Sequence, residues 1–465
     1  EIPQTGDRGI RLADVVNGKN TLEEFTAQLT DYDLSCIIRG EGMGSPKVTA
    51  GTAAAFGGVS DTLTALGIPC ACCDDGPSGM RLDCGTKAFS LPNGTLLAST
   101  FDRPLMTELF TFMGLEMHTN QVDCLLGPGM NIHRHPLNGR NFEYFSEDPY
   151  LTGEMASAEL AGLHSTGAEG TIKHFCGNNR ETRRHFLDSV ISERALREIY
   201  LRGFEKAVKK GGAKSVMTTY GQVNGVWTAG NYGLVTGILR DDWGFDGFTM
   251  TDWWANINRR GKAPDKSDFA AMAMAQNDVY MVTADGAACN DNTLDSLKSG
   301  ELTRGELQRN AMNILRFLTT THAMKRVMGC DDETEIINRP ADAGDVDSTD
   351  IEFHDIDEDL TLDLTGITTE KGSSYAFGLN VSKPGVYKVT LTASSTLSEL
   401  AQTSVSIFAL GSPCGMFTFN GTSGAPVSQT KDVKFLSNFM PIRLYFGGSG
   451  LKTQSIRFEL KERWT

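Results

Sequence analysis

Short apolar runs alternate with helical patterns from about residue 20 to residue 325. In one clear instance, Ser192 can cap a helical pattern that is followed by the strand pattern AKSVMTTY, the helical pattern YGLVTGILRDDWG and the strand pattern FDGFTMTDWW. Strands separated by helices pair in parallel, because each helix carries the chain back to the same edge of the sheet. The alternation therefore predicts an α/β domain, and either a closed (β/α) barrel or a doubly wound sheet fits its length.

Two further observations refine this prediction. Thr21 and Glu24 have the spacing of a capping box at the start of the first helical pattern. No GxGxxG fingerprint follows a strand pattern, so the dinucleotide-binding version of the doubly wound sheet loses support.

The composition changes after about residue 330. Residues 331–359 are acidic and poor in apolar side chains, which predicts a linker. Its DVDSTD motif lacks the glycine and the distal glutamate of an EF-hand calcium loop. Residues 360–465 contain runs such as GVYKVTLTAS and SIRFELKE between turn residues. They predict a smaller antiparallel β-sandwich, jelly-roll-like or of the fibronectin type.

The overall composition is that of a globular protein, with 40% hydrophobic and 22% charged residues. A net charge of -15 disfavours a nucleic-acid partner, and no apolar run is long enough to predict a membrane span. The first residues do not resemble a signal peptide. The ten cysteines are scattered, and even the group Cys70, Cys72, Cys73 and Cys84 favours buried free thiols over a metal site or disulfides. We therefore expect a reducing, cytoplasmic setting.

Polar residues follow several strand patterns. They are Asp75 in ACCDDGPSGMR, Lys173 and His174 in GTIKHFCGNN, and Asp252 in FTMTDWW. Each also has an ordinary structural explanation. An aspartate after a strand often caps the next helix, and DGP forms turns. In a Lys-His pair, one residue often lies at the surface and the other in the core. The segment NIHRHPLNGRNFEYFSEDP contributes Arg140 but has no metal-ligand spacing.

Taken together, these residues indicate a sugar site. In a parallel barrel all of them would lie at the carboxyl ends of the strands, where active sites form. Such a polar ring could bind several hydroxyl groups, while Trp253 and Trp254 offer an apolar surface on which a sugar face stacks. Asp252 would then be directed at the bound sugar.

Five motifs in order resemble glycoside hydrolase family 3, particularly its β-glucosidases. They are DDGPSGMR, GPGMNIHRHPLNGRNFEYFSEDPYLTGEMA, GTIKHFCGNNRETRR, SVMTTYGQVNG and GFDGFTMTDWWA, and the similarity covers roughly residues 20–325. The resemblance implies a (β/α)8 TIM-like barrel over residues 1–330. It implies a retaining hydrolase that removes terminal β-linked glucose without a metal or other cofactor.

The resemblance also implies site residues. Asp252 matches the family's nucleophile, which forms a covalent glycosyl-enzyme. The resemblance implies five substrate-binding residues: Asp75, Arg140, Lys173, His174 and Tyr220. Trp253, whose indole follows Asp252, is the sixth predicted substrate-binding residue. The absence of PGHG after KHF separates this chain from the family's N-acetylglucosaminidases, whose acid/base is a histidine.

One departure concerns the acid/base. Family β-glucosidases usually take this glutamate from an α/β sandwich domain, and neither end of this sequence has such a pattern. We therefore expect that none of Glu41, Glu143 and Glu147 is the acid/base, and that a second polypeptide supplies this residue. The alternatives are a non-catalytic carbohydrate-binding protein or a β-xylosidase of the same family.

Overall fold

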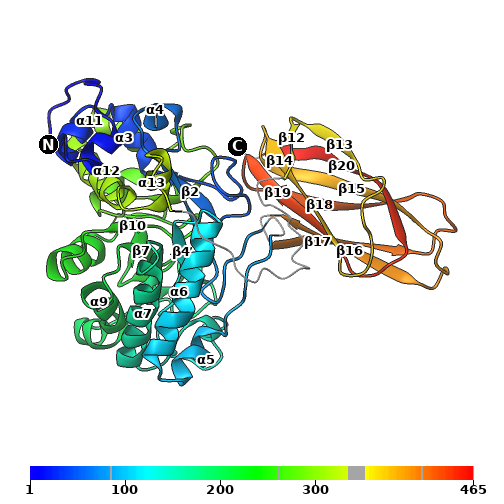
Figure 1. The fold of residues 1–465 in the computed structure, drawn as a ribbon, viewed down its shortest axis with the longest axis horizontal. Coiled ribbons are helices and arrows are strands. Elements are labelled where there is room, and N and C mark those ends of the chain that lie inside the picture. Colours follow the sequence, from blue (N-terminus) through cyan, green and yellow to red (C-terminus); the bar gives the residue numbers. More distant parts are fainter. Residues whose placement is uncertain (84–85, 260, 333–350, 410–411, 464–465) are drawn as a thin grey trace. The chain divides into compact units, whose positions relative to one another are not determined.

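The computed structural model describes residues 1–83, 86–259, 261–332, 351–409 and 412–463. Contacts between residues divide the chain into two units (Figure 1). The first consists of 1–41, 54–81 and 88–337, and the second of 42–53, 82–87 and 338–465. Among the described residues, no helix has both the length and the apolarity that crossing a membrane requires.

The first unit is built on an eight-stranded sheet. In sheet order its strands are β10 (Phe248–Met250), β7 (Ser215–Thr218), β5 (Glu169–Phe175), β4 (Cys124–Leu126), β3 (Cys70–Asp75), β2 (Ala54–Gly57), β1 (Arg39–Glu41) and β11 (Tyr280–Thr283). A parallel bridge between Met250 and Val279 joins β10 to the start of β11. This bridge closes the sheet, so the fold is the TIM-like barrel and not the open doubly wound sheet.

Helical segments surround the strands. They are α1 (Leu12–Val16), α2 (Leu22–Ala27), α3 (Asp31–Ile37), α4 (Asp61–Ala65), α5 (Gly94–Ser99), α6 (Arg103–Thr119), α7 (Pro149–His164), α8 (Glu193–Ala195), η3 (Leu196–Tyr200), α9 (Arg202–Lys209), η5 (Gly233–Asp242), α10 (Phe269–Met274), α11 (Thr293–Ser299), α12 (Arg304–Leu318) and α13 (His322–Val327). Helix α7 packs against both α6 and α9 along one flank of the sheet (Figure 1). The predicted capping box is present, since Thr21 Oγ1 accepts from the Glu24 amide and the Glu24 carboxylate accepts from the Thr21 amide.

One strand departs from the regular barrel. Strand β2 runs antiparallel to both β1 and β3. No helix separates β1 from β2 in the described chain, and an antiparallel neighbour needs only a loop, whereas a parallel one needs a crossover. Phe56 of β2 nevertheless joins the core, stacking on Phe248 of β10 with ring centroids 5.1 Å apart.

The second unit contains two facing sheets. The five-stranded sheet has the order β12 (Phe353–Ile356), β14 (Ser374–Val381), β19 (Phe439–Phe446), β16 (Gln402–Ala409), β17 (Ser412–Asn420). The four-stranded sheet has the order β13 (Asp359–Asp363), β20 (Leu451–Arg463), β15 (Gly385–Ser395), β18 (Val427–Phe435). All pairs are antiparallel except β12 with β14. Side chains that alternate inward, such as Phe377, Tyr387 and Phe458, form the sandwich core.

The predicted linker, 331–359, overlaps with this sandwich. Residues 333–350 lie outside the described chain, but β12 and the first residue of β13 fall within the predicted range. Segments 42–53 and 82–87, which we placed in the barrel domain, group with the second unit by their contacts. The domain boundaries therefore stay a prediction that requires an experiment.

Cutting the chain within residues 331–359 provides that experiment. We expect the barrel to remain folded, because its strands and helices form a core of their own. Segments 42–53 and 82–87 should become sensitive to protease, because they lose the rest of their unit. Thermal unfolding and limited proteolysis of the shortened chain measure both effects. Aggregation of the shortened chain would show that the barrel does not fold without residues 360–465.

The described cysteines are free thiols. Cys72 and Cys73 are buried in β3, Cys70 is half-buried, and Cys84 lies outside the described residues. Burial raises the pKa of the Cys72 and Cys73 thiols well above its ordinary value, which makes them inert core side chains.

Candidate active site

The carboxyl ends of parallel strands bring the predicted residues together. Asp75 is the last residue of β3, and Lys173 and His174 lie near the end of β5. Tyr220 follows β7, and Asp252 follows β10. Because β3, β4, β5, β7 and β10 are parallel along the sheet, these side chains share one end of the barrel.

Asp75 opens a tight turn that fixes its position. Gly76 has φ +123°, and a Cβ there would come within 1.7 Å of the Gly79 carbonyl oxygen, so only glycine fits. The Lys173 ammonium donates to Asp75 Oδ1 at 3.0 Å, and Arg81 Nη1 lies 3.6 Å from Oδ2. Burial alone would raise the pKa of Asp75, but the positive charges of Lys173 and Arg81 lower it to about 2. This carboxyl group is therefore ionised at neutral pH.

His174 is held rigidly beside the nucleophile candidate. The Asn131 amide accepts from the His174 backbone N–H and donates to its carbonyl oxygen, both at 2.9 Å. The Tyr144 hydroxyl lies 3.2 Å from Nδ1, while Nε2 lies 3.7 Å from Asp252 Oδ2. Burial, reinforced by the charge of Arg140, holds the pKa of His174 well below its ordinary value. The ring is neutral and can exchange hydrogen bonds with a hydroxyl group.

The two oxygens of Asp252 have different surroundings. Oδ1 accepts from the Trp253 backbone N–H at 2.8 Å. Oδ2 is buried and accepts no hydrogen bond of ordinary geometry from the described residues, although hydrogen bonding to Asp252 is among the causes that raise the pKa of the Tyr220 phenol. Leaving a buried carboxylate oxygen unpaired costs about 1–3 kcal/mol, which folding alone would not favour. Burial raises the pKa of Asp252 above its ordinary value, against the opposing charges of Arg140, Arg184 and Lys173.

Arg140 contributes a positive charge to the same region. Its guanidinium pairs with the Glu143 carboxylate and lies over the Tyr144 ring, 5.8 Å from the centroid. The charges of Glu143 and Asp252 are among the causes that keep its pKa high, against the opposing effect of burial.

Two aromatic residues were also predicted. Tyr220 is buried, with the Arg184 guanidinium over its ring at 4.6 Å and the His185 ring 4.0 Å away. Burial and the charge of Asp252 raise the pKa of the Tyr220 phenol, so it stays protonated and can donate. Trp253 is buried, and the adjacent Trp254 is half-buried with a left-handed backbone (φ +55°).

Sequence reasoning missed four residues that act on these groups. Arg81 and Arg184 bring positive charge to Asp75 and Asp252, and Asn131 and Tyr144 fix His174. All four lie inside quoted motifs: Arg81 in DGPSGMR, Arg184 in NNRETRR, and Asn131 and Tyr144 in the motif that begins GPGMN. Nothing in the local pattern of the two arginines shows that the chain turns them toward the carboxylates.

The glutamates that we considered for the acid/base have other surroundings. Glu143 pairs with Arg140, and Glu147 is exposed. Glu41 is fully buried in β1, where its Oε2 accepts from the Gly286 backbone N–H at 3.3 Å. The contacts of Glu41 and Glu143 hold them as structural groups.

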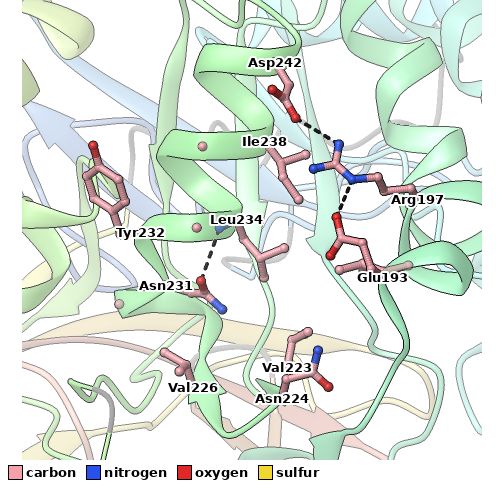
Figure 2. A pocket seen from close by; sticks show the side chains of 14 residues that line it. Glu193, Arg197, Val223, Asn224, Val226, Asn231, Tyr232, Leu234, Ile238 and Asp242 are labelled. Carbon is pink, nitrogen blue, oxygen red and sulfur yellow. Dashed lines mark hydrogen bonds and ion pairs between the residues drawn. The ribbon is translucent and has the colours of Figure 1, made fainter.

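A cavity of about 700 Å³ lies elsewhere on the barrel, between the segment that starts at α8 and helical segment η5 (Figure 2). Arg197 spans it by pairing with both Glu193 and Asp242, and apolar side chains such as Leu234 and Ile238 line it. None of the predicted site residues lines this cavity. The arrangement of charged groups, rather than a hollow of this kind, identifies the candidate site.

Comparison with known proteins tests the resemblance directly. The profile of the glycosyl hydrolase family 3 N terminal domain matches residues 8–317, well over half of the chain. The chain belongs to glycoside hydrolase family 3. Its five motifs, including those of Asp75, Lys173 and Asp252, lie within the matched range.

Relatives with known names support this membership. A "Beta-glucosidase" of Ruminococcus albus is 62% identical over 100% of this chain and 50% of its own length. The crystal structure of a beta-glucosidase from Paenibacillus barengoltzii is 45% identical, with a TM-score of 0.69, over 98% of this chain and 49% of that one. Beta-glucosidase 3B from Thermotoga neapolitana, solved in complex with glucose, is 37% identical, with a TM-score of 0.61, over 67% of this chain and 44% of that one.

The family 3 chain described here spans about half the length of the most similar of these relatives. In the Ruminococcus and Paenibacillus proteins, the matching segment lies within a single longer polypeptide. The expectation of a second polypeptide therefore finds no support. It was inferred from the missing pattern of an α/β sandwich domain, which does not distinguish another chain from another part of the same chain.

Proposed function

We propose that this chain forms the barrel part of a retaining β-glucosidase in which Asp252 is the nucleophile. The observation that carries the proposal is the asymmetry of the Asp252 carboxylate. A backbone N–H fixes one oxygen, and the other is buried and accepts no hydrogen bond of ordinary geometry from the described residues. A nucleophile requires one oriented oxygen that is free to form a bond, and the position of Asp252 after β10 directs such an oxygen to the end of the barrel where the other site residues lie.

The reaction follows from this geometry. Asp252 Oδ2 attacks the anomeric carbon, and the bond from that carbon to the leaving oxygen breaks as a carboxylic acid protonates the oxygen. The same acid group then takes a proton from water, which cleaves the glycosyl ester and releases the sugar. The positive charges of Arg140, Arg184 and Lys173 favour the ionised form of Asp252 that attack requires.

The remaining residues would hold the sugar. The Asp75 carboxylate, paired with Lys173, can accept from hydroxyl groups, and Lys173 and Arg140 can donate to them. His174 and Tyr220, both uncharged, can position hydroxyl groups beside Asp252, and Trp253 can offer an apolar surface. Charge-assisted hydrogen bonds of this kind give strong binding and fix orientation.

The names of the relatives support a choice of sugar. We propose glucose because several relatives are named β-glucosidases. An "Exo-alpha-(1->6)-L-arabinopyranosidase" of Bifidobacterium longum is also 37% identical over 55% of this chain, so a second sugar should be tested. A β-xylosidase is the second candidate, and initial rates on aryl β-glucoside and aryl β-xyloside distinguish the two.

The acid/base belongs, in our proposal, to the part of the longer polypeptide that this sequence does not cover. The contacts of Glu41 and Glu143 support this assignment, and so does the length of the relatives. In a retaining site the two carboxyl groups lie about 5–5.5 Å apart, so the covering part must reach to the carboxyl ends of the strands.

Replacing Lys173 or Asp75 by alanine tests the sugar site. Each change removes a charged hydrogen bond to a hydroxyl group, so each should weaken glucose binding by about 1.5–3 kcal/mol, or roughly 10- to 150-fold in Kd. Calorimetric titration with glucose measures the loss. Lys214→Ala is the control, because Lys214 forms an exposed pair with Asp246 and should leave Kd unchanged. Wild-type affinity in K173A or D75A would remove that residue from the proposed site.

Two further predictions extend beyond the site. We propose a cytoplasmic location because the described cysteines are free thiols, several of them deep in the core. We also propose that the sandwich domain, residues 360–465, binds carbohydrate. Binding of the shortened and uncut chains to cello-oligosaccharides tests the second proposal.

A further inference from the structure

Two histidines and an aspartate converge at the amino ends of the barrel strands. His118 lies near the end of α6, His322 is the first residue of α13, and Asp331 follows α13. One ligand atom from each residue lies within 4.8 Å of the other two. The cluster adjoins Thr166 and Asp123, which precede β5 and β4, so it lies at the end of the barrel away from Asp252.

The hydrogen bonds of His322 determine which of its nitrogens is a ligand. Nε2 lies 2.8 Å from the Thr166 carbonyl oxygen, which can only accept, so Nε2 carries the hydrogen. Nδ1 of the neutral ring then bears a lone pair and lies 2.6 Å from Asp331 Oδ1. Two lone-pair atoms at this distance share a proton, and a metal ion that binds both would take the place of that proton and move the two atoms further apart. A metal-binding histidine typically donates its other N–H to a carbonyl oxygen in this way.

His118 completes the cluster. Its Nε2 lies 3.4 Å from the same oxygen, Asp331 Oδ1, and its ring stacks on that of His322 with centroids 3.8 Å apart. Both histidine side chains are less than a tenth exposed, while Asp331 is 15% exposed. Arg326 lies 3.6 Å from the other oxygen of Asp331, which leaves Oδ1 directed at the two rings.

From this convergence we propose that His118, His322 and Asp331 bind a divalent transition-metal ion of the zinc type. Two imidazole nitrogens and one carboxylate oxygen are common zinc ligands, with metal–ligand distances of about 2.0–2.2 Å. The partial exposure of Asp331 leaves room for water as the fourth ligand. Side-chain rotations would be needed to bring the three atoms to these distances, and the atoms start within 4.8 Å of one another.

The ion would cross-link helix ends that pack on the barrel. It would join the end of α6 to α13 and to the segment that follows α13, which the His322–Thr166 hydrogen bond already ties to the start of β5. Groups at this end of a barrel contribute to stability rather than chemistry. The ion should therefore stabilise the fold and leave the turnover of folded molecules unchanged. The site is additional to the proposed glycosidase function and does not depend on it.

Titration of the dialysed 465-residue chain with zinc sulfate tests the proposal. We expect one Zn²⁺ per chain by calorimetry, and a Tm that rises with free zinc because the metal binds only the folded state. Cobalt(II) should give the intense visible absorption of a four-coordinate site. His118→Gln and Asp331→Asn should each weaken zinc binding by at least about 10- to 100-fold, since even changes to outer-sphere partners have effects of this size.

His164→Gln is the matched control. His164 Nε2 lies 3.0 Å from Glu169 Oε2, but His164 belongs to no three-ligand group among the described residues. This variant should bind zinc like the parent. Two results would overturn the proposal: a parent chain that binds no stoichiometric zinc, or H118Q and D331N variants that bind it with parental affinity. Because the readouts are binding, Tm and absorption, loss of glycosidase activity does not affect the test.

Discussion

Replacing Asp252 by asparagine should abolish turnover of an activated aryl β-glucoside while the fold stays intact. The amide has the shape of the carboxylate but cannot form the glycosyl ester, so we expect a rate loss of at least about 10⁴-fold, on the scale of removing a covalent nucleophile in other enzymes. Steady-state kinetics measure the loss, and Tm reports the fold. Because burial outweighs the attraction of the nearby positive charges and raises the pKa of Asp252, D252N should be as stable as the parent or more so.

An activated fluoro-sugar identifies the nucleophile independently of rate. It should label Asp252, and peptide mass spectrometry locates the modified residue. Asp246→Asn is the matched control, because Asp246 precedes the same strand but is 60% exposed and paired with Lys214. It should retain parental rates. A label on any other carboxylate would refute the assignment of Asp252.

The second large effect concerns the leaving group. This chain alone should react slowly with an aryl glucoside whose leaving group needs no protonation, and should barely react with an alkyl glucoside. General acid catalysis typically contributes about 10²–10⁴-fold, and the alkyl substrate should lack that contribution. Extending the chain with the remaining half of the Ruminococcus albus relative should restore the alkyl substrate. Initial rates on both substrates, with and without the extension, measure the difference.

Replacing the glutamates of this chain tests the opposing hypothesis that one of them is the acid/base. Glu41→Gln, Glu143→Gln and Glu147→Gln should leave the ratio of alkyl to aryl rates unchanged. If the chain alone hydrolyses the alkyl glucoside fully, and one of these changes abolishes that activity, then the acid/base lies within the barrel. A chain that binds glucose but never forms the glycosyl ester would instead be a carbohydrate-binding protein.

The sequence predicted those parts of the fold that depend on local pattern. Periodicity and caps located α2, β7 and β10, and the strands of the sandwich lie where alternating runs predicted them. The antiparallel direction of β2 was not predictable, because direction depends on the partner strand rather than on the strand's own residues. The closure of the barrel was not predictable either, because it depends on the pairing of Met250 with Val279.

For the candidate site too, the sequence predicted only what local pattern and strand order determine. Asp75, Lys173, His174 and Asp252 end or follow strands, so topology alone gathers them at one edge. Arg184 contacts Tyr220 from the short 3-10 helix η2 (Arg184–Phe186), which no periodicity in the sequence predicted. His118 and His322 are far apart in sequence and have no motif spacing, so the expectation of no metal did not consider them. Residues that meet through long loops or helix ends require the folded structure.

The division of the chain into two units has a consequence for protein engineering. The chain leaves the barrel unit after Glu41 and again after Arg81, and returns both times before the C-terminal part begins. A chimera that exchanges only the C-terminal part would therefore combine the strands of a foreign sandwich with segments 42–53 and 82–87 of this chain. These two segments evolved to fold with the original sandwich strands. A successful exchange should transfer residues 42–53 and 82–87 together with the C-terminal part. In evolution, the same interleaving would oppose the shuffling of this sandwich onto other barrels as an independent module.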